Sequence, residues 1–198
     1  MNAKGNSTRQ EIVKKSLELF SVKGYFNTSI GDIMAATGLT KGGLYGHFGS
    51  KEAIWDACYE EAVRIWTEIV FKDVTAIDDP LERLLKVIEN DMGDYLGGNI
   101  FPGGCFFLNM IVELSGQAEH MKNRIWQGFE GFGKRMSTWL GEAETKGLIR
   151  SGLDHGEISG FVIIVLNGAA ALYAVTKDPL VWQRTVRQLR AYLEQLRV

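Results

Sequence analysis

The spacing of the apolar residues constrains the fold of this chain more than any other feature. The first segment places Ile12, Val13, Leu17 and Phe20 on one helical face, and residues 121–143 continue the same rhythm over a longer stripe. A period near 3.6 residues is typical of amphipathic helices, whereas half-buried strands alternate at every second residue. No segment alternates convincingly, so the sequence predicts an all-α fold.

Capping residues and glycines divide this pattern into nine expected helices. The first should begin after Ser7 or Thr8, with Glu11 completing a capping box, and should end at Gly24. The expected N-caps of the second to fifth helices are Thr28, Thr40, Ser50 and Asp79. The expected ranges of the second to ninth helices are about 28–38, 40–48, 50–70, 79–96, 105–114, 118–145, 161–175 and from 179 onward.

The chain is expected to divide near Gly49 into a head of short helices, residues 1–49, and a body of long helices, residues 50–198. Residues 1–51 hold seven Lys and Arg against three Asp and Glu, an excess of four positive charges. The remaining residues hold 15 against 21, an excess of six negative charges. A basic head on an acidic body predicts that the head contacts a polyanion such as DNA.

No targeting, membrane, metal or enzyme motif stands out. The first eight residues are polar, which argues against a signal peptide. Residues 161–175 are apolar but shorter than the roughly 20 residues that span a bilayer, so a buried helix is expected there. His47, His120 and His155 are scattered along the chain, which predicts no metal site. Without a phosphate-binding loop or a nucleophile motif, the sequence predicts no cofactor and no catalytic residue.

Residues 28–51 carry the most functional information. Two short helices joined by a turn at 37–39 fit a helix-turn-helix, with Gly38 expected at positive φ. The residues expected to pack this unit against the first helix are Ile30, Ile33, Leu39, Leu44 and Phe48. The third helix then begins with short or polar side chains, so its backbone can approach a major groove, where Lys41 can reach a phosphate or a guanine edge.

This stretch closely resembles the TetR (tetracycline-repressor) family of transcriptional regulators. The resemblance covers about residues 8–55 and is carried by Phe20, Gly24-Tyr25-Phe26, Thr28, Ile33, residues 36–42, Leu44-Tyr45, His47-Phe48 and Lys51-Glu52. It implies a nine-helix architecture and a cytoplasmic, nucleoid-associated homodimer that represses transcription by binding palindromic double-stranded operator DNA.

The resemblance also implies which residues contact DNA. Thr28, Tyr45, His47 and Lys51 fall on phosphate-contacting positions. Ser29, Thr40, Lys41, Gly42 and Gly43 fall where family members meet bases or the nearby backbone. Other roles stay open: Thr28 and Thr40 could only cap helices, Tyr45 could be half-buried core, and His47 could be a solvated side chain.

For the body, the resemblance implies a small-molecule effector and a dimer interface on the last two helices. The ninth segment carries a 4-3-4-3 apolar seam that should meet another helix: Trp182, Val186, Leu189, Leu193 and Leu196. The residues expected to line an effector chamber, each of which could instead be core, are Trp66, Met92, Cys105, Phe107, Met110, Trp126, Phe129 and Asn167. The alternative functions are a structural or division-associated DNA-binding protein with a filled body, and an enzyme.

The two cysteines, Cys58 and Cys105, form no CxxC pair, which suits a reducing cytoplasm. Cys105 is expected in the first turn of the sixth helix, where free amides and the helix dipole favour the thiolate. The sequence therefore raises the hypothesis that Cys105 senses electrophiles and that the effector is largely apolar or electrophilic. The alternative is that Cys105 is a small buried hydrophobe, as most free cysteines are.

Overall fold

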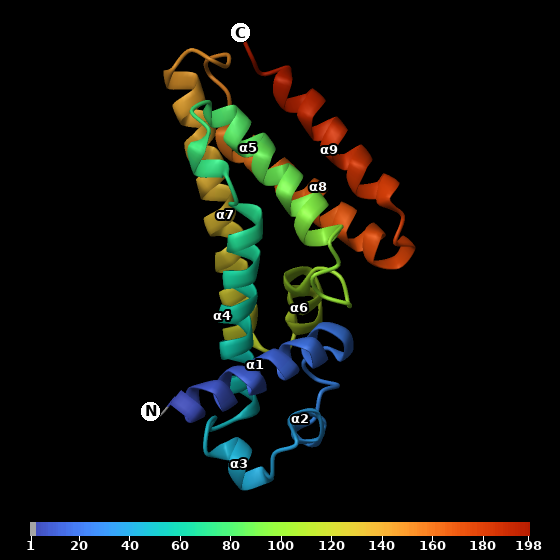
Figure 1. The fold of residues 1–198 in the computed structure, drawn as a ribbon. Coiled ribbons are helices and arrows are strands. Elements are labelled where there is room, and N and C mark those ends of the chain that lie inside the picture. The colour runs from blue at the N-terminus through green and yellow to red at the C-terminus, as the bar shows by residue number, and fades with distance from the viewer. Residues whose placement is uncertain (1–2) are drawn as a thin grey trace.

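The computed structural model describes residues 3–198, which form nine α-helices and no strand (Figure 1). The α-helices are α1 (Ala3–Lys23), α2 (Ile30–Thr37), α3 (Lys41–Tyr45), α4 (Lys51–Val70), α5 (Pro80–Glu89), α6 (Phe106–Leu114), α7 (Glu119–Thr145), α8 (His155–Thr176) and α9 (Pro179–Glu194). A 3-10 turn, η1 (Val74–Ala76), precedes α5, and a π-helical turn, η2 (Asn90–Leu96), follows it directly. The predicted all-α class is confirmed.

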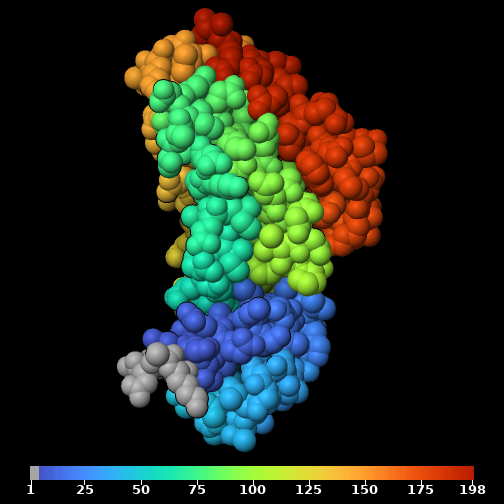
Figure 2. All heavy atoms as spheres, viewed as in Figure 1, coloured from blue at the N-terminus to red at the C-terminus, as the bar shows by residue number. Residues whose placement is uncertain are grey.

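The molecule is elongated, with α1, α2 and α3 gathered at one end and the remaining helices, α4 to α9, extending away from them (Figures 1 and 2). α1 lies across the base of α4, and the start of α4 is buried in the head because Ile54 and Trp55 have almost no exposed surface. Ile33, Leu44 and Phe48 are buried, while Ile30 and Leu39 pack partly buried against the core. The predicted packing of the helix-turn-helix against α1 is therefore confirmed.

The predicted caps are mostly confirmed. Thr40, Ser50 and Asp79 each accept a hydrogen bond from a backbone amide in the first turn of the following helix. The second cap is Ser29 and not Thr28, because the Ser29 hydroxyl and the Asp32 carboxylate form a reciprocal capping box. The first helix also begins earlier than expected, at Ala3, so that Ser7 and Thr8 lie inside it.

The fifth expected helix, residues 79–96, changes its hydrogen-bonding pattern part-way. α5 ends at Glu89, and residues 90–96 form the π-helical turn η2. The Asn90 side chain donates to the carbonyl oxygens of Val70 and Lys72 at 3.0 Å, which fixes the start of this turn against the end of α4. A π-turn holds an extra residue compared with an α-helical turn, and such turns are frequent at functional sites.

The predicted role of the α9 seam in a dimer is wrong for its main residues. Leu189, Leu193 and Leu196 are buried within the single chain, where α9 packs on α5, η2 and α8. Trp182 lies against η2, since a Cβ added at Gly93 would stand 3.6 Å from its ring. Val186 is likewise partly buried against the same core. A heptad-like seam specifies that a helix is covered, and here the covering helices come from the same chain.

The eighth helix is longer than the apolar run predicted. It spans 22 residues and is long and apolar enough to cross a membrane, by length and composition alone. One face is buried in the body through Val162, Leu166 and Tyr173, and the buried Ser159 hydroxyl donates to the carbonyl oxygen of His155 at 2.7 Å. Core helices often share this composition, and the contacts place α8 between α7 and α9.

Candidate functional site

The helix-turn-helix presents the start of α3 to solvent. Gly38 reverses the chain between the two helices at a φ of 69°, and the Thr40 hydroxyl accepts from the amide of Gly43 at 3.2 Å. Lys41 and Gly42 are exposed beyond this cap. Because no large side chain covers this turn, the backbone of α3 can come close to a flat or grooved polyanion.

The predicted DNA-contacting residues lie around this turn, with one exception. Ser29, Thr40, Lys41, Gly42 and Tyr45 are exposed, whereas Gly43, His47 and Lys51 are partly buried. The Lys51 ammonium stands 4.2 Å from the centre of the Tyr25 ring, at the start of α4. The exception is Thr28, which has no exposed surface. Its hydroxyl donates to the carbonyl oxygen of Gly24 at 2.6 Å, so Thr28 holds the turn before α2 and the predicted phosphate contact is wrong for this conformation.

A carboxylate from the body holds that same turn. Glu113, near the end of α6, accepts hydrogen bonds from the backbone amides of Tyr25 and Phe26, both at 2.8 Å. Gly24 lies directly beneath it at a φ of 81°, and an added Cβ there would stand 2.5 Å from a Glu113 oxygen. Charge-assisted hydrogen bonds of this kind are about twice as strong as neutral ones. Sequence reasoning found Gly24 as a helix end and missed Glu113, because their separation of about 90 residues leaves no local pattern.

The loop before α6 makes a second contact with α1. The amide of Gly103 donates to the Ser21 hydroxyl at 3.3 Å. A Cβ at Gly103 would overlap the carbonyl oxygen of Ser21, so only glycine allows this approach. The segment around α6 is therefore tied to α1 both before the helix begins and near its end.

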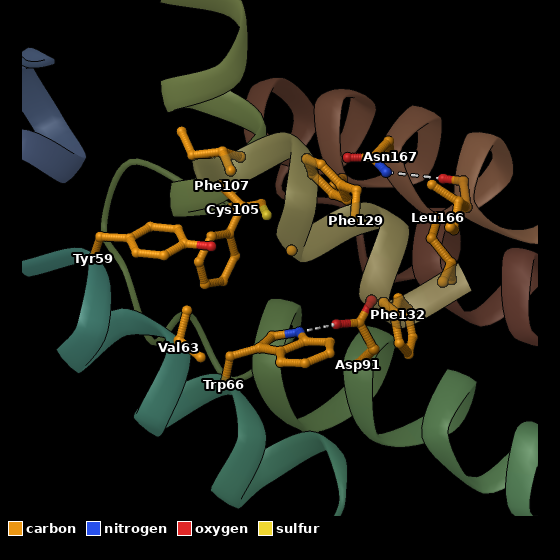
Figure 3. A pocket seen from close by; sticks show the side chains of 14 residues that line it. Tyr59, Val63, Trp66, Asp91, Cys105, Phe107, Phe129, Phe132, Leu166 and Asn167 are labelled. Atoms are coloured by element: carbon orange, nitrogen blue, oxygen red, sulfur yellow. Dashed lines mark hydrogen bonds between the residues drawn. The ribbon is translucent and has the colours of Figure 1, made fainter. Parts of the chain in front are cut away.

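Beside the first turn of α6 the body contains a cavity of about 160 Å³. Figure 3 shows aromatic side chains from α4, α6 and α7 turned toward one another around it. The lining residues are Tyr59, Val63, Trp66, Asp91, Cys105, Phe107, Ile125, Gly128, Phe129, Phe132, Ile163, Leu166, Asn167 and Ala170. A cavity of about 150 Å³ is enough to hold benzene in a protein core, so this one accommodates a ligand of about one ring.

The only carboxylate among these lining residues belongs to Asp91 in the π-turn η2. One of its oxygens accepts from the indole nitrogen of Trp66 at 2.8 Å (Figure 3). Among residues 3–198 the carboxylate has no other hydrogen bond and no ion pair. Burial therefore raises the pKa of Asp91 to about 6, and the Trp66 hydrogen bond offsets only part of that effect.

Five of the eight predicted effector-chamber residues lie at this cavity: Trp66, Cys105, Phe107, Phe129 and Asn167. The other three do not. Met92 and Met110 are fully buried in the core beside it, and Trp126 is exposed on the outer face of α7. Sequence reasoning missed Asp91, because an acidic residue in an amphipathic helix is normally assigned to solvent. In the described part of the chain, no three His, Cys, Asp or Glu side chains are grouped as a metal site requires.

Of the two alternatives for Cys105, the structure favours the unactivated thiol over the electrophile sensor. Cys105 precedes the first residue of α6, and the amides of Leu108 and Phe107 do favour its thiolate. Burial outweighs them and raises the pKa of Cys105 to about 11. Burial also raises the pKa of Cys58, whose thiol donates to the carbonyl oxygen of Val13. Both cysteines are therefore thiols at neutral pH.

Comparison with known proteins agrees with this architecture. Residues 12–58 match the family model for bacterial regulatory proteins of the tetR family, and residues 80–189 match that for the tetracyclin repressor-like C-terminal domain. The chain belongs to the TetR family. Its members include DNA-binding transcriptional regulators and repressors with a helix-turn-helix, and this chain is a regulator of that kind. The TetR family therefore accounts for both the head and the body.

Several relatives extend over nearly the whole chain. An HTH-type transcriptional regulator of Lactococcus lactis is 27% identical and covers 96% of this chain and 95% of its own. The HTH-type transcriptional repressor DhaR of a Mycobacterium species is 28% identical over 81% of this chain and 79% of its own. TetR-family crystal structures from Cytophaga hutchinsonii and Chloroflexus aurantiacus have TM-scores of 0.88 and 0.89. Both are 26% identical and cover at least 99% of this chain and 98% of their own.

Asp91, which is half-buried with its carboxyl at the cavity, makes a testable contribution to stability. Its folded-state pKa of about 6 exceeds the ordinary 3.8, so the folded protein keeps a proton that the unfolded chain releases. The free energy of unfolding should therefore fall as pH rises from about 4 to about 6, by about 2–3 kcal/mol. Asp91→Asn removes this loss. Denaturant unfolding should show that the free energy of unfolding of the variant rises relative to that of the wild type by that amount between pH 4.5 and 7.5.

Asp94→Asn is the matched control, because Asp94 lies in the same π-turn but is exposed. Its difference from the wild type should stay constant over this pH range. An equally constant difference for Asp91→Asn would show that Asp91 is not buried as an unpaired acid.

The state of Cys105 can be followed by its alkylation. With a pKa of about 11, its reaction with iodoacetamide should accelerate about tenfold per pH unit between pH 7 and 10, because only the thiolate reacts. Single variants Cys58→Ser and Cys105→Ser separate the two thiols in a mass-spectrometric time course. A rate for Cys105 that levels off below pH 8 would contradict this assignment and restore the sensing hypothesis.

Proposed function

We propose that this TetR-family protein is a repressor that binds palindromic operator DNA as a homodimer and is released by a small molecule in the body cavity. The observation that carries the proposal is the position of α6. Phe107 in its first turn lines the cavity, and Glu113, six residues later, holds the turn between α1 and α2. One helix thus contacts both the candidate ligand site and the head.

A ligand that moves α6 would act directly on the turn that connects α1 to α2 in the head. The rise of 1.5 Å per residue puts Phe107 and Glu113 about 9 Å apart along the helix axis. Displacing α6 would either strain the two hydrogen bonds from Tyr25 and Phe26 or carry that turn along. Since α2 starts only a few residues later, the recognition helices of a dimer would change their spacing on the operator.

For the DNA contact we propose residues 1–49 as the binding head and residues 50–198 as the body. α3 would enter the major groove with Thr40, Lys41, Gly42 and Gly43 nearest the bases, as the exposure of its first turn supports. Ser29, Tyr45, His47 and Lys51 flank this turn and would contact the phosphate backbone. The location expected for such a regulator is the cytoplasm, in association with the nucleoid.

For the dimer we propose the outer face of α8, with a second copy of this chain as its partner. The side chains of Ile164, Leu172 and Val175 are exposed by 71%, 62% and 85%. Phe161 extends the face and stacks edge-on with Tyr192 of α9, at 5.1 Å between ring centres. Gly168 lies on the same face, where it permits close approach of a second helix. A palindromic operator requires such a twofold partner.

The cavity also bears on the two alternative functions. A structural or division-associated DNA-binding protein needs no internal ligand site, and its body could be filled. The space of about 160 Å³ beside α6 supports an effector instead. Enzymatic chemistry would need convergent acid and base groups, and the proposal assigns the chain no catalytic step.

The roles of Lys51 and Glu113 in DNA binding can be separated by salt. Operator fragments are first selected from random DNA with the purified protein. Lys51→Ala should weaken binding and flatten the slope of log K against log salt by about 1.8, because one phosphate contact is lost in each of the two half-sites and each contributes about 0.9. Glu113→Gln should weaken binding about tenfold with an unchanged slope, because it loosens the head without removing a phosphate contact.

Glu130→Gln, an exposed change in the middle of α7, is the control for charge alone and should bind like the wild type. Fluorescence anisotropy at several salt concentrations gives both quantities. Wild-type affinity in the Glu113→Gln variant would remove Glu113 from the proposed coupling route.

The dimer interface can be tested with one buried charge. Ile164→Asp places a carboxylate at the centre of the exposed α8 face, where a second copy would bury it unpaired, so the variant should be monomeric at micromolar concentration. Val112→Asp on α6 changes a residue of similar exposure, 66%, outside this face and should leave the dimer intact. Sedimentation velocity distinguishes the two states. A dimeric Ile164→Asp protein would show that α8 is not the interface.

A further inference from the structure

The polar group of the cavity indicates what kind of molecule it binds. From this geometry we infer that the effector is a small aromatic or aliphatic organic cation, whose charged nitrogen pairs with Asp91 inside the ring of aromatic side chains. The inference rests on the proposed function, in that it names the ligand class of the same cavity.

The first argument is the incomplete pairing of Asp91. Its carboxylate accepts from Trp66 and, within residues 3–198, makes no other hydrogen bond or ion pair. A buried carboxylate with one partner is costly, and proteins normally pair such a charge or neutralise it. The cavity is the open side of this group, so a ligand cation is the natural partner.

The second argument is the arrangement of the rings. Trp66 and Phe132 pack edge to face with their centres 5.0 Å apart, and Trp66 and Phe107 do so at 6.3 Å. Tyr59 and Phe129 complete the wall (Figure 3). Aromatic faces attract organic cations, and a cage of several rings is a recurring way to bind an ammonium group. Among the described residues no Lys or Arg belongs to the lining of the cavity. Arg124 lies over the Tyr59 ring at 4.9 Å, but its charge is paired with Asp56 and Glu60.

The third argument is that the remaining polar groups are occupied or neutral. The Tyr59 hydroxyl donates to the carbonyl oxygen of Arg124, and the Asn167 amide nitrogen donates to that of Ile163. The Cys105 thiol faces the cavity uncharged, and burial raises the pKa of its neighbour Tyr95 as well. Asp91 is thus the one group at the cavity that can carry charge near neutral pH, since burial raises its pKa only to about 6.

Three one-ring probes that differ mainly in charge test the inference: the 2-phenylethylammonium ion, 2-phenylethanol and phenylacetate. Calorimetric titration at pH 7.5 should give the order cation, alcohol, anion, with the cation bound at least about tenfold more tightly than the alcohol, as expected for a hydrogen bond to a charged group. Asp91→Asn should reduce this preference to about twofold while leaving the alcohol affinity in place. Asp94→Asn, exposed in the same π-turn, should keep the wild-type preference.

Cation binding should also weaken as pH falls below about 6, when Asp91 takes up a proton. The other titratable groups facing Asp91, Cys105 and Tyr95, stay neutral over this range, so they do not contribute. The alcohol affinity should not change with pH.

The inference is overturned if the alcohol or the anion binds as tightly as the cation, if Asp91→Asn keeps the preference, or if the cation does not bind at millimolar concentration, the range expected of a one-ring ligand. Operator binding measured with each probe separates the two proposals. If only the alcohol releases the operator, the proposed effector-released repressor is supported and the proposed cationic ligand class is wrong. Asp91-dependent cation binding that leaves operator affinity unchanged would uphold the ligand class and reject effector release.

Discussion

The carboxylate of Glu113 determines how the head of this regulator sits on its body. It accepts two backbone amides in the turn after α1, and the positive φ of Gly24 is what brings both amides to face it. Backbone hydrogen bonds fix a direction as well as a distance, so the turn cannot rotate without breaking one of them. The contact between Gly103 and Ser21 further restricts how α1 can move relative to the loop before α6. The orientation of α2 and α3 therefore depends on these polar contacts together with the apolar packing of α1 against the start of α4.

The sequence predicted local structure correctly where a capping residue marks a helix end or where apolar residues repeat on one helical face. Thr40, Ser50 and Asp79 cap the helices that they were predicted to cap, and the helix-turn-helix packs as its apolar spacing indicates. Ser29 takes the cap predicted for Thr28, because adjacent hydroxyl residues both suit an N-cap and only the capping box with Asp32 selects one. The Glu113 contact had no local signature, since its two ends are 88 residues apart.

The differences in the body have separate physical causes. A 4-3-4-3 seam predicts that α9 is covered but not by which chain, and α5, η2 and α8 cover it here. The helical period did place Asp91 on one face with Ile88 and Tyr95, at intervals of three and four residues. The sequence alone did not single it out, because an acidic residue in an amphipathic helix is normally assigned to solvent. For Cys105 the sequence left two alternatives open, and the structure favours the buried thiol because burial acts more strongly on its pKa than the amides of the helix start, and in the opposite direction.

The residues that line most of the cavity and the residues that hold the head lie on different elements, and this separation has an evolutionary consequence. The charge of the cavity is contributed by one side chain on η2, and most of its walls come from α4, α7 and α8. The connection to the head runs instead through α6 and its preceding loop, by way of backbone amides and glycines. If the proposed effector release is right, single substitutions at Asp91 or Asn167 would change which ligand binds and leave the contacts between α6 and the head unchanged. A chain built this way is a suitable starting point for biosensors whose specificity is redesigned without rebuilding their output.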